Sequence, residues 1–303
     1  YEASGKLHVV CAGTNGIMDY TLNSKGKVTA TKKISIKYDV FGGFYKGTDG
    51  KFYVAVGYQN PTESRTKTVI KVIQYNSKWK KLKTASIKSN ASNAFEGIVQ
   101  PFYAGNCSME MKGDTLYLFT SRMMFVHSDG LNHQSNISFT IDTKKMKVSE
   151  ANESYCSHSF NQYVRFKDDD LYLVDHGDAY PRSILITAVN GYEPGAYESI
   201  FDVGAFQFQG ETGDNYTGCT IGGMEVGNDN ILVCGTSVPH KYKIKGVTGS
   251  DSSYKKNVYV LVTDRETGKT KVKWLTTYNP ATSATTVGQT RMLKLTEDRY
   301  VIL

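Results

Sequence analysis

Short apolar stretches alternate with tight turns of Gly, Asp and Asn along the whole chain. Six times, an apolar stretch returns from such a turn and leads into a polar segment. The returning stretches begin at Leu7, Phe52, Leu116, Leu171, Ile231 and Tyr300, between 45 and 69 residues apart. Gly, Asp and Asn tolerate a positive φ and hydrogen-bond to their own backbone, so they favour the turns of β-hairpins. A hairpin that recurs at this period indicates a repeat architecture.

A second pair of apolar stretches follows most of these hairpins. The pairs are residues 67–75 with 79–87, 137–141 with 146–149, and 258–263 with 269–276. Two hairpins in each repeat give four antiparallel strands, which make one blade of a β-propeller. The sequence therefore predicts an all-β fold, a β-propeller of four-stranded antiparallel blades. We expect at least six blades, with six favoured over seven, and a ring that is incomplete at the termini.

The repeat covers nearly the whole chain, and no linker or shift in composition divides it. We therefore expect a single propeller domain over residues 1–303. Residues 1–36 form a partial first blade that lacks its innermost strand, and residues 287–303 form a partial last blade. Full blades are expected at 37–89, 101–151, 155–203 and 217–277. An apolar strand left unpaired at Leu303 would be a liability, so we expect the natural protein to continue and close the ring.

Composition and charge indicate which kinds of binding partner are not expected. No apolar run approaches the roughly 18 residues of a membrane-spanning helix, so membrane insertion is not expected. The net charge of +7 comes from 29 Lys against only 7 Arg, and the lysines are scattered over turns and outer strands. Nucleic-acid-binding proteins gather Arg and Lys on one face, so we expect no nucleic-acid partner.

The five cysteines are expected to be buried free thiols. Their number is odd, which argues against a complete disulfide framework, and the sequence contains no CxxC pair. Without such a pair, a structural zinc site is not expected.

Three polar segments, residues 129–136, 156–162 and 175–182, fall around the expected third and fourth blades. In a propeller, the connection into an innermost strand and the connection between the two middle strands emerge on the same face. The three segments should therefore converge on one rim of the central channel, where loops on a rigid scaffold commonly carry function. If no bulge intervenes, strand alternation places His158 and Gln162 on the same side of their segment.

The candidate ligand-binding side chains at this rim are amides, imidazoles and guanidinium groups. They are Asn106, His133, Gln134, Asn136, His158, Asn161, Gln162, His176, Arg182, Gln289 and Arg291. Amides suit sugar hydroxyls, and Arg matches a carboxylate. Tyr180, Phe125 and Tyr216 could offer flat apolar surfaces to a sugar ring. The alternative is that the polar groups satisfy buried backbone atoms and that the aromatic rings pack within the blades.

Asp175 and Asp178 are candidate ligands for a divalent cation, because two carboxylates and the imidazole of His176 lie within four residues. The spacing departs from that of a calcium loop. The competing interpretation is that both carboxylates cap backbone N–H groups of the turn and bind Arg182.

Histidine and glutamine near a propeller axis resemble the metal site of propeller-type oligogalacturonate lyases. The resemblance rests on the residue types of His133, Gln134, His158 and Gln162 alone, because their spacing matches no lyase motif. It implies a metal-assisted polysaccharide lyase or glycosidase. His133, His158 and His176 would then be metal ligands or bases, and Arg182 would neutralise a substrate carboxylate.

The Lys-, Asn-, Tyr- and Ser-rich, Arg-poor composition resembles that of secreted or wall-attached propellers of Gram-positive gut bacteria. We see no nucleophile elbow, P-loop or dinucleotide fingerprint. The leading hypothesis is a secreted or cell-surface binding module, monomeric and without a cofactor, that holds a glycan or protein ligand on the polar face of the channel. The metal-assisted enzyme, with its divalent cation, and a protein-interaction scaffold are the alternatives.

Overall fold

The computed structural model describes residues 1–13, 15–90, 97–152, 156–212, 217–239, 256–279, 287–297 and 299–303. Throughout these ranges the regular structure is β-strand, and no helix occurs among them. Accordingly, no helix of the described part is long and apolar enough to cross a membrane. The strands pair antiparallel in five sheets of four strands along the main path, followed by a two-stranded hairpin.

The first two blades occupy the N-terminal third of the chain. The first blade contains β1 (Glu2–Ala3), β2 (Lys6–Gly13), β3 (Gly16–Leu22) and β4 (Val28–Ser35). The second contains β5 (Val40–Lys46), β6 (Phe52–Gly57), β7 (Thr68–Tyr75) and β8 (Lys81–Lys88).

The third, fourth and fifth blades follow the same order from the innermost to the outermost strand. The third contains β10 (Ser108–Lys112), β11 (Thr115–Val126), β12 (Asn132–Asp142) and β13 (Lys147–Asn152), with β9 (Gln100–Pro101) paired to β11. The fourth contains β14 (Tyr163–Lys167), β15 (Asp170–Gly177), β16 (Ser183–Glu193) and β17 (Ala196–Gln207). The fifth contains β18 (Thr220–Val226), β19 (Asn230–Ser237), β20 (Asn257–Asp264) and β21 (Thr270–Trp274). The final hairpin is β22 (Met292–Thr296) with β23 (Arg299–Ile302).

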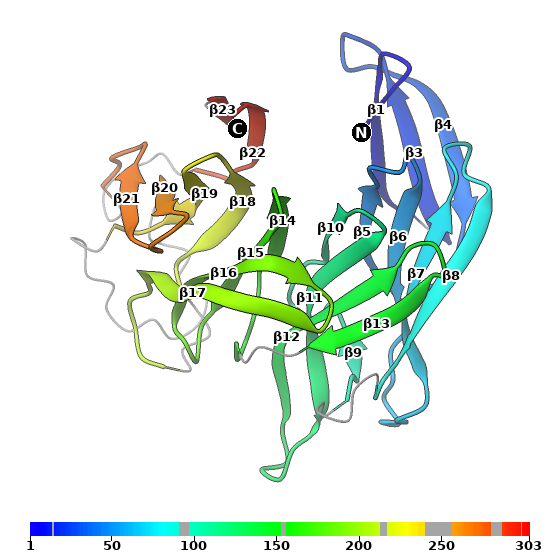
Figure 1. The fold of residues 1–303 in the computed structure, drawn as a ribbon, viewed down its shortest axis with the longest axis horizontal. Helices are drawn as coiled ribbons and strands as arrows, with labels where there is room; N and C mark the ends of the chain where they lie inside the picture. The colour runs from blue at the N-terminus through cyan, green and yellow to red at the C-terminus, as the bar shows by residue number, and fades with distance from the viewer. Residues whose placement is uncertain are drawn as a thin grey trace.

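The blades follow one another around a common axis. The innermost strands β5, β10, β14, β18 and β22 contact each other in that order, and β2 of the first blade contacts β5. In Figure 1 the colours therefore run around the molecule from blue to red, and the N-terminus and the β22–β23 hairpin lie on the same side of the view. The propeller fold expected from the sequence is confirmed.

The expected number of blades is wrong. The structure has five four-stranded blades, not six or seven, because β22 and β23 form a sheet of only two strands in the described residues. The hairpin signature reports turn chemistry within one pair of strands, so it could not show whether two further strands join them. The first blade also has an innermost strand, β1, which reverses into β2 through Ser4 and Gly5 with φ values of 52° and 69°.

The core lies between the faces of neighbouring blades. Side chains of the second blade, such as Val72, pack with those of the third, such as Leu118 and Phe139. Val174 and Val233 belong to a corresponding cluster between the fourth and fifth blades. Because each central strand is covered on both faces, all six residues of β6 are buried. Each buried large apolar side chain contributes about 1.5–3 kcal/mol to stability, so these interfaces hold the blades together.

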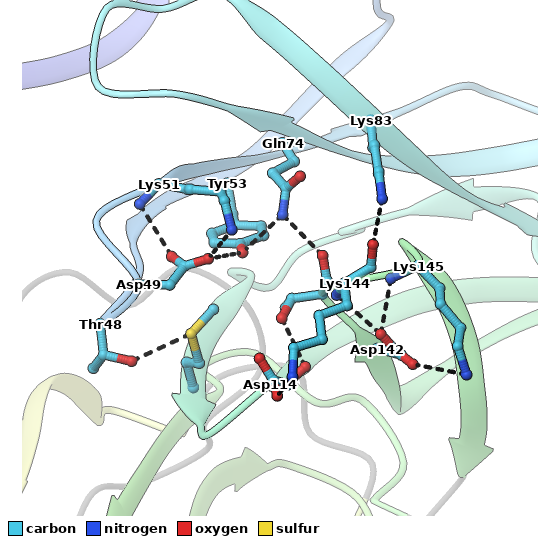
Figure 2. A network of polar contacts seen from close by, with 12 residues as sticks. Thr48, Asp49, Lys51, Tyr53, Gln74, Lys83, Asp114, Asp142, Lys144 and Lys145 are labelled. Atoms are coloured by element: carbon cyan, nitrogen blue, oxygen red, sulfur yellow. Dashed lines mark hydrogen bonds and ion pairs between the residues drawn. The ribbon is translucent and has the colours of Figure 1, made fainter.

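Polar side chains also form hydrogen bonds between neighbouring blades, at the edges of the apolar interfaces. Buried Gln74 of the second blade donates to the hydroxyl of Tyr53 at 3.0 Å (Figure 2) and to the carbonyl of Thr143 in the third blade at 2.9 Å. Arg265 of the fifth blade similarly donates to the hydroxyl of Tyr172 in the fourth at 2.8 Å. Such bonds satisfy buried polar groups and fix the relative position of the blades.

Candidate functional site at the rim of the third and fourth blades

The three polar segments meet between the third and fourth blades, as the propeller geometry predicted. Isolated β-bridges join Ser135 to Ser157 and Ser159 to Gly177, so residues 156–162 lie between β12 and β15. The backbone N–H of His158 also donates to the carbonyl of Gln134 at 2.8 Å. Segments far apart in the sequence thus form one continuous hydrogen-bonded unit.

Asp175 stands at the centre of this unit. Its buried carboxylate accepts hydrogen bonds from Asn136 Nδ2 at 2.7 Å, Ser159 Oγ at 2.6 Å and Gln162 Nε2 at 3.2 Å. The backbone N–H of His176 donates to it at 2.7 Å. Burial raises the pKa of Asp175, while these donors act in the opposite direction. The carboxylate is saturated by the protein, so it fixes the segments rather than facing a ligand.

The predicted amide residues bind the protein backbone in the same way. Asn106 Oδ1 accepts the N–H of Gln162 at 2.6 Å, and Gln162 Oε1 accepts the N–H of Asn106 at 3.1 Å. The side chain of Gln134 donates to the carbonyl of Tyr103 at 2.9 Å and also binds the backbone of Ser159. These contacts match the alternative interpretation, in which the amides satisfy buried backbone groups.

His158 is held in an unusual position by Asp178. Its Nδ1 lies 2.8 Å from Oδ1 of Asp178, whose side chain is completely buried. Asp178 makes no further side-chain hydrogen bond in the described residues. The Asp178 carboxylate raises the pKa of His158, and partial burial opposes it. The His158 side chain is 31% exposed and its backbone φ is +54°, a conformation that concentrates at functional sites.

This backbone conformation changes the direction of the side chains. The sequence predicted that His158 and Gln162 would point the same way along an extended strand. Instead His158 turns to Asp178, while Gln162 turns to Ser159 and Asp175. The condition for that expectation, an uninterrupted strand, is not met, because the positive φ of His158 breaks the alternation.

Two further predicted residues are buried behind the rim. His176 lies against the rings of Phe160 and Phe208, and its Nε2 is 2.9 Å from the hydroxyl of Thr217. Burial lowers the pKa of His176 to about 3, so the imidazole is neutral at ordinary pH. Arg182 donates to the carbonyls of Asp178 at 2.6 Å and Gln209 at 2.7 Å. Both side chains therefore support the loop that carries Asp178.

The side chains of the other predicted residues take no part in this network. Asn161 Oδ1 accepts the N–H of Ile221 in the fifth blade at 3.4 Å. Arg291 donates to Gln289 Oε1 at 3.3 Å just before β22. His133 binds Asp129 at 2.7 Å on the turn between β11 and β12.

The three aromatic residues predicted to contact a sugar ring differ in their exposure to solvent. Phe125 is buried and Tyr180 is exposed, whereas Tyr216 lies outside the described residues.

Two exposed tyrosines belong to segments that are hydrogen-bonded to the neighbours of His158 in the sequence. The carbonyl of Tyr180 accepts the N–H of Ser157 at 3.0 Å, and Gln134 joins the backbone of Tyr103 to that of Ser159. Tyr180 is 68% exposed and Tyr103 is 37% exposed. We call His158, Asp178, Tyr103 and Tyr180 the rim site. It presents two aromatic rings and one imidazole on a hydrogen-bonded base.

A polar ring on the innermost strands was not predicted from the sequence. It consists of Tyr45, Glu110, Arg165, Glu225 and Lys294, and we call it the channel ring. These residues occupy equivalent positions on five innermost strands, where they pair with Tyr53, Tyr117, Tyr172, Leu232 and Tyr300 of the next strand. The signal was present, because a charged residue stands between two apolar ones at the same place in four hairpins.

Most members of the channel ring contact one another across blade boundaries. The hydroxyl of Tyr45 donates to Glu110 Oε1 at 3.1 Å. Arg165 lies 3.7 Å from Glu110 and 3.3 Å from Glu225, so one guanidinium group serves two carboxylates. Burial raises the pKa of Glu110, and Arg165 opposes this effect. Lys294 instead binds the carbonyl of Val226 at 2.9 Å.

Comparison with known proteins gives similarity of fold only. No protein-family model matches the sequence. A search of curated proteins likewise finds no match.

Three of the solved structures that resemble the chain illustrate the range of TM-scores and coverage. A cobalt-substituted Synechocystis apocarotenoid oxygenase has a TM-score of 0.46 at 12% identity, over 91% of this chain and 59% of that one. An exo-β-1,3-galactanase from Phanerochaete chrysosporium has a TM-score of 0.42 at 10% identity, over 80% and 50%. A xylan β-1,4-xylosidase from Bacillus halodurans C-125 has a TM-score of 0.40 at 11% identity, over 78% and 43%. The chain spans about half the length of these structures.

Proposed function

We propose that this protein binds a glycan at the rim site, as a secreted or cell-surface module. One observation carries the proposal: exposed Tyr103 and Tyr180 are linked through hydrogen bonds to Ser159 and Ser157, the two residues next to partly exposed His158. Tyrosine offers a flat apolar face for a sugar ring and a hydroxyl for hydrogen bonding. The imidazole of His158 adds a polar group that can donate to or accept from a sugar hydroxyl.

The base beneath these side chains supports the same proposal. Asp175, Gln134 and Gln162 tie three segments of two blades together through buried hydrogen bonds. A base that is already ordered loses little conformational entropy when a ligand binds, which favours affinity. The binding groups would therefore be the few side chains that project from the base, not the amides within it.

A glycan array followed by calorimetric titration tests this function. The wild type should bind a glycan, and Tyr103→Ala and Tyr180→Ala should each weaken binding about tenfold, as expected when an aromatic contact of roughly 1.4 kcal/mol is lost. Tyr197→Ala is the matched control, because Tyr197 is an exposed tyrosine on the outermost strand β17 of the fourth blade. Capture of a protein but of no glycan, or full binding by both rim variants, would overturn the proposal in favour of a protein-interaction scaffold or another face.

A second candidate function, glycoside hydrolysis, rests on the channel ring. Glycosidases commonly use two carboxylic acids, one kept protonated by a raised pKa and the other ionised. Glu110 and Glu225 lie on either side of Arg165, and burial raises the pKa of Glu110. In this function Glu110 would be the acid and Glu225 the ionised partner stabilised by Arg165.

Release of reducing ends from a panel of polysaccharides tests the second candidate. If it is correct, Glu110→Gln should lower the rate about 10²–10⁴-fold, the usual contribution of a general acid. Glu198→Gln on the exposed face of β17 is the control and should keep the wild-type rate. The pH–rate profile should lose its basic limb in Glu110→Gln, a change that a purely structural carboxylate would not produce. Wild type without hydrolytic activity on the panel would leave binding as the function.

A further inference from the structure

The turn between β11 and β12 gathers three side chains that bind transition metals. His127, Asp129 and His133 each place one ligand atom within 4.8 Å of the others. His133 Nε2 and Asp129 Oδ2 are 2.7 Å apart, and the rings of His127 and His133 have centroids 5.7 Å apart. His133 and its polar segment were candidates from the sequence, but the grouping with His127 follows only from the folded turn.

The turn itself is well defined. The N–H of His127 donates to the carbonyl of Leu131 at 2.9 Å, and Gly130, with φ +81°, donates back to His127 at 2.9 Å. Asp129 Oδ1 accepts the N–H of Leu131 at 2.9 Å, which leaves Oδ2 directed to His133.

Glu63, from the second blade, fixes the base of this hairpin. Its carboxylate accepts the N–H of Val126 at 2.9 Å and Asn132 Nδ2 at 3.3 Å. The three ligand groups therefore project from a braced turn.

The ligand set is selective in its chemistry. Two imidazoles and one carboxylate suit Zn²⁺, Co²⁺, Ni²⁺ and Cu²⁺, whereas Ca²⁺ and Mg²⁺ prefer oxygen ligands throughout. In a tetrahedral zinc site with bonds of about 2.0–2.1 Å, neighbouring ligand atoms are roughly 3.3 Å apart. The Asp129 and His133 ligand atoms are 2.7 Å apart and no separation in the group exceeds 4.8 Å, so small rotations of these surface side chains would bring the three atoms to that spacing. Three protein ligands leave a fourth position for water or another ligand.

We propose that His127, Asp129 and His133 form a binding site for one divalent transition-metal ion of the zinc class. The site lies at the exposed tip of the β11–β12 hairpin, on the same face as the rim site but separate from its residues. It does not depend on glycan binding. A bound ion would cross-link the two arms of the turn and present an open coordination position beside the rim.

Titration of the full chain with Co²⁺ tests this proposal. The wild type should bind one equivalent and develop visible d–d bands without a thiolate charge-transfer band, because the ligands are nitrogen and oxygen. His127→Ala and His133→Ala should each weaken binding at least tenfold, and Zn²⁺ should displace Co²⁺.

Two matched variants separate this site from other binding. Leu131→Ala changes an exposed side chain of the same turn without removing a ligand, and His8→Ala removes a histidine of the first blade; both should bind Co²⁺ like the wild type. All variants are to be checked for a wild-type melting transition, since the changes lie in an exposed turn. The proposal would be overturned if the wild type showed no saturable binding of Co²⁺. It would also be overturned if His127→Ala and His133→Ala both bound Co²⁺ as tightly as the wild type.

Discussion

His158 and His176 belong to the same rim, yet their surroundings shift their pKa values in opposite directions. Asp178 raises the pKa of His158 by favouring the imidazolium form. Burial lowers the pKa of His176 to about 3, because its apolar surroundings exclude the charged form. Each histidine therefore gives folding stability its own dependence on pH.

The two dependences have opposite signs. For His158 the extra stability is fully present below the unfolded-state pKa of about 6.5 and is lost as pH rises through the raised folded-state pKa. For His176 stability is lost as pH falls from about 6.5 toward 3, because only the unfolded chain takes up a proton there. Urea unfolding between pH 4 and 9 should show that His158→Gln removes the loss on the basic side. His176→Gln should reduce the loss on the acidic side, and unchanged pH profiles in both variants would contradict these assignments.

Part of the rim could be predicted from single residues. The convergence of the three polar segments followed from the turn pattern and the propeller geometry. The partner of each side chain did not, because Asn136 and Asp175 are 39 positions apart and meet only in the folded chain. The positive φ of His158 likewise arises from its tertiary contacts with Asp178 and Gln134, which no local pattern encodes.

The innermost strands carry the channel ring, so they contribute ion pairs as well as apolar packing to the stability of the fold. Arg165→Met should destabilise the protein by about 1–3 kcal/mol, because Glu110 and Glu225 would lose their shared cation in a partly buried place. Adding Glu110→Gln and Glu225→Gln to Arg165→Met should recover part of this loss. Urea denaturation of the single and triple variants checks it, and a single variant as stable as the wild type would show that the ring contributes nothing.

Strand β19 illustrates how closely the strands of a blade pack. A Cβ added at Gly235 would lie 1.9 Å from the carbonyl oxygen of Thr220 and 2.4 Å from the hydroxyl of Tyr259. Since backbone cannot yield cheaply, Gly235→Ala should lower the free energy of unfolding by roughly 1–3 kcal/mol. Gly288→Ala is the control, because its Cβ would meet no atom within 4 Å. Equal melting temperatures for the two variants would contradict this packing.

The strands themselves were largely predictable, and their one systematic error has a physical cause. The sequence pattern predicted a connection over residues 129–136, but β12 already begins at Asn132. Gln134, Ser135 and Asn136 are polar and buried, with their side chains hydrogen-bonded inside the rim. A polar pattern is typical of loops. The first residues of β12 are polar although they are buried and hydrogen-bonded, so the pattern predicted a loop there.

At the scale of the whole molecule, the strands of different blades differ in how deeply they are buried. The central strands β6 and β19 are paired on both sides and almost entirely buried. In the described part of the chain, β23 pairs only with β22, and Leu293 and Leu295 of that hairpin are exposed. Amide hydrogen exchange should therefore be slowest in β6 and β19 and at least a hundredfold faster in β23. Uniform protection across all three strands would contradict this gradient.

The central claim is that a glycan contacts His158 at the rim site. The most direct measurement follows the imidazole resonances of the protein by NMR while the glycan identified on the array is added. The His158 signals, assigned with His158→Gln, should shift in proportion to occupancy, while those of His8 in the first blade stay in place. A saturating glycan that leaves the His158 signals unchanged would contradict the claim.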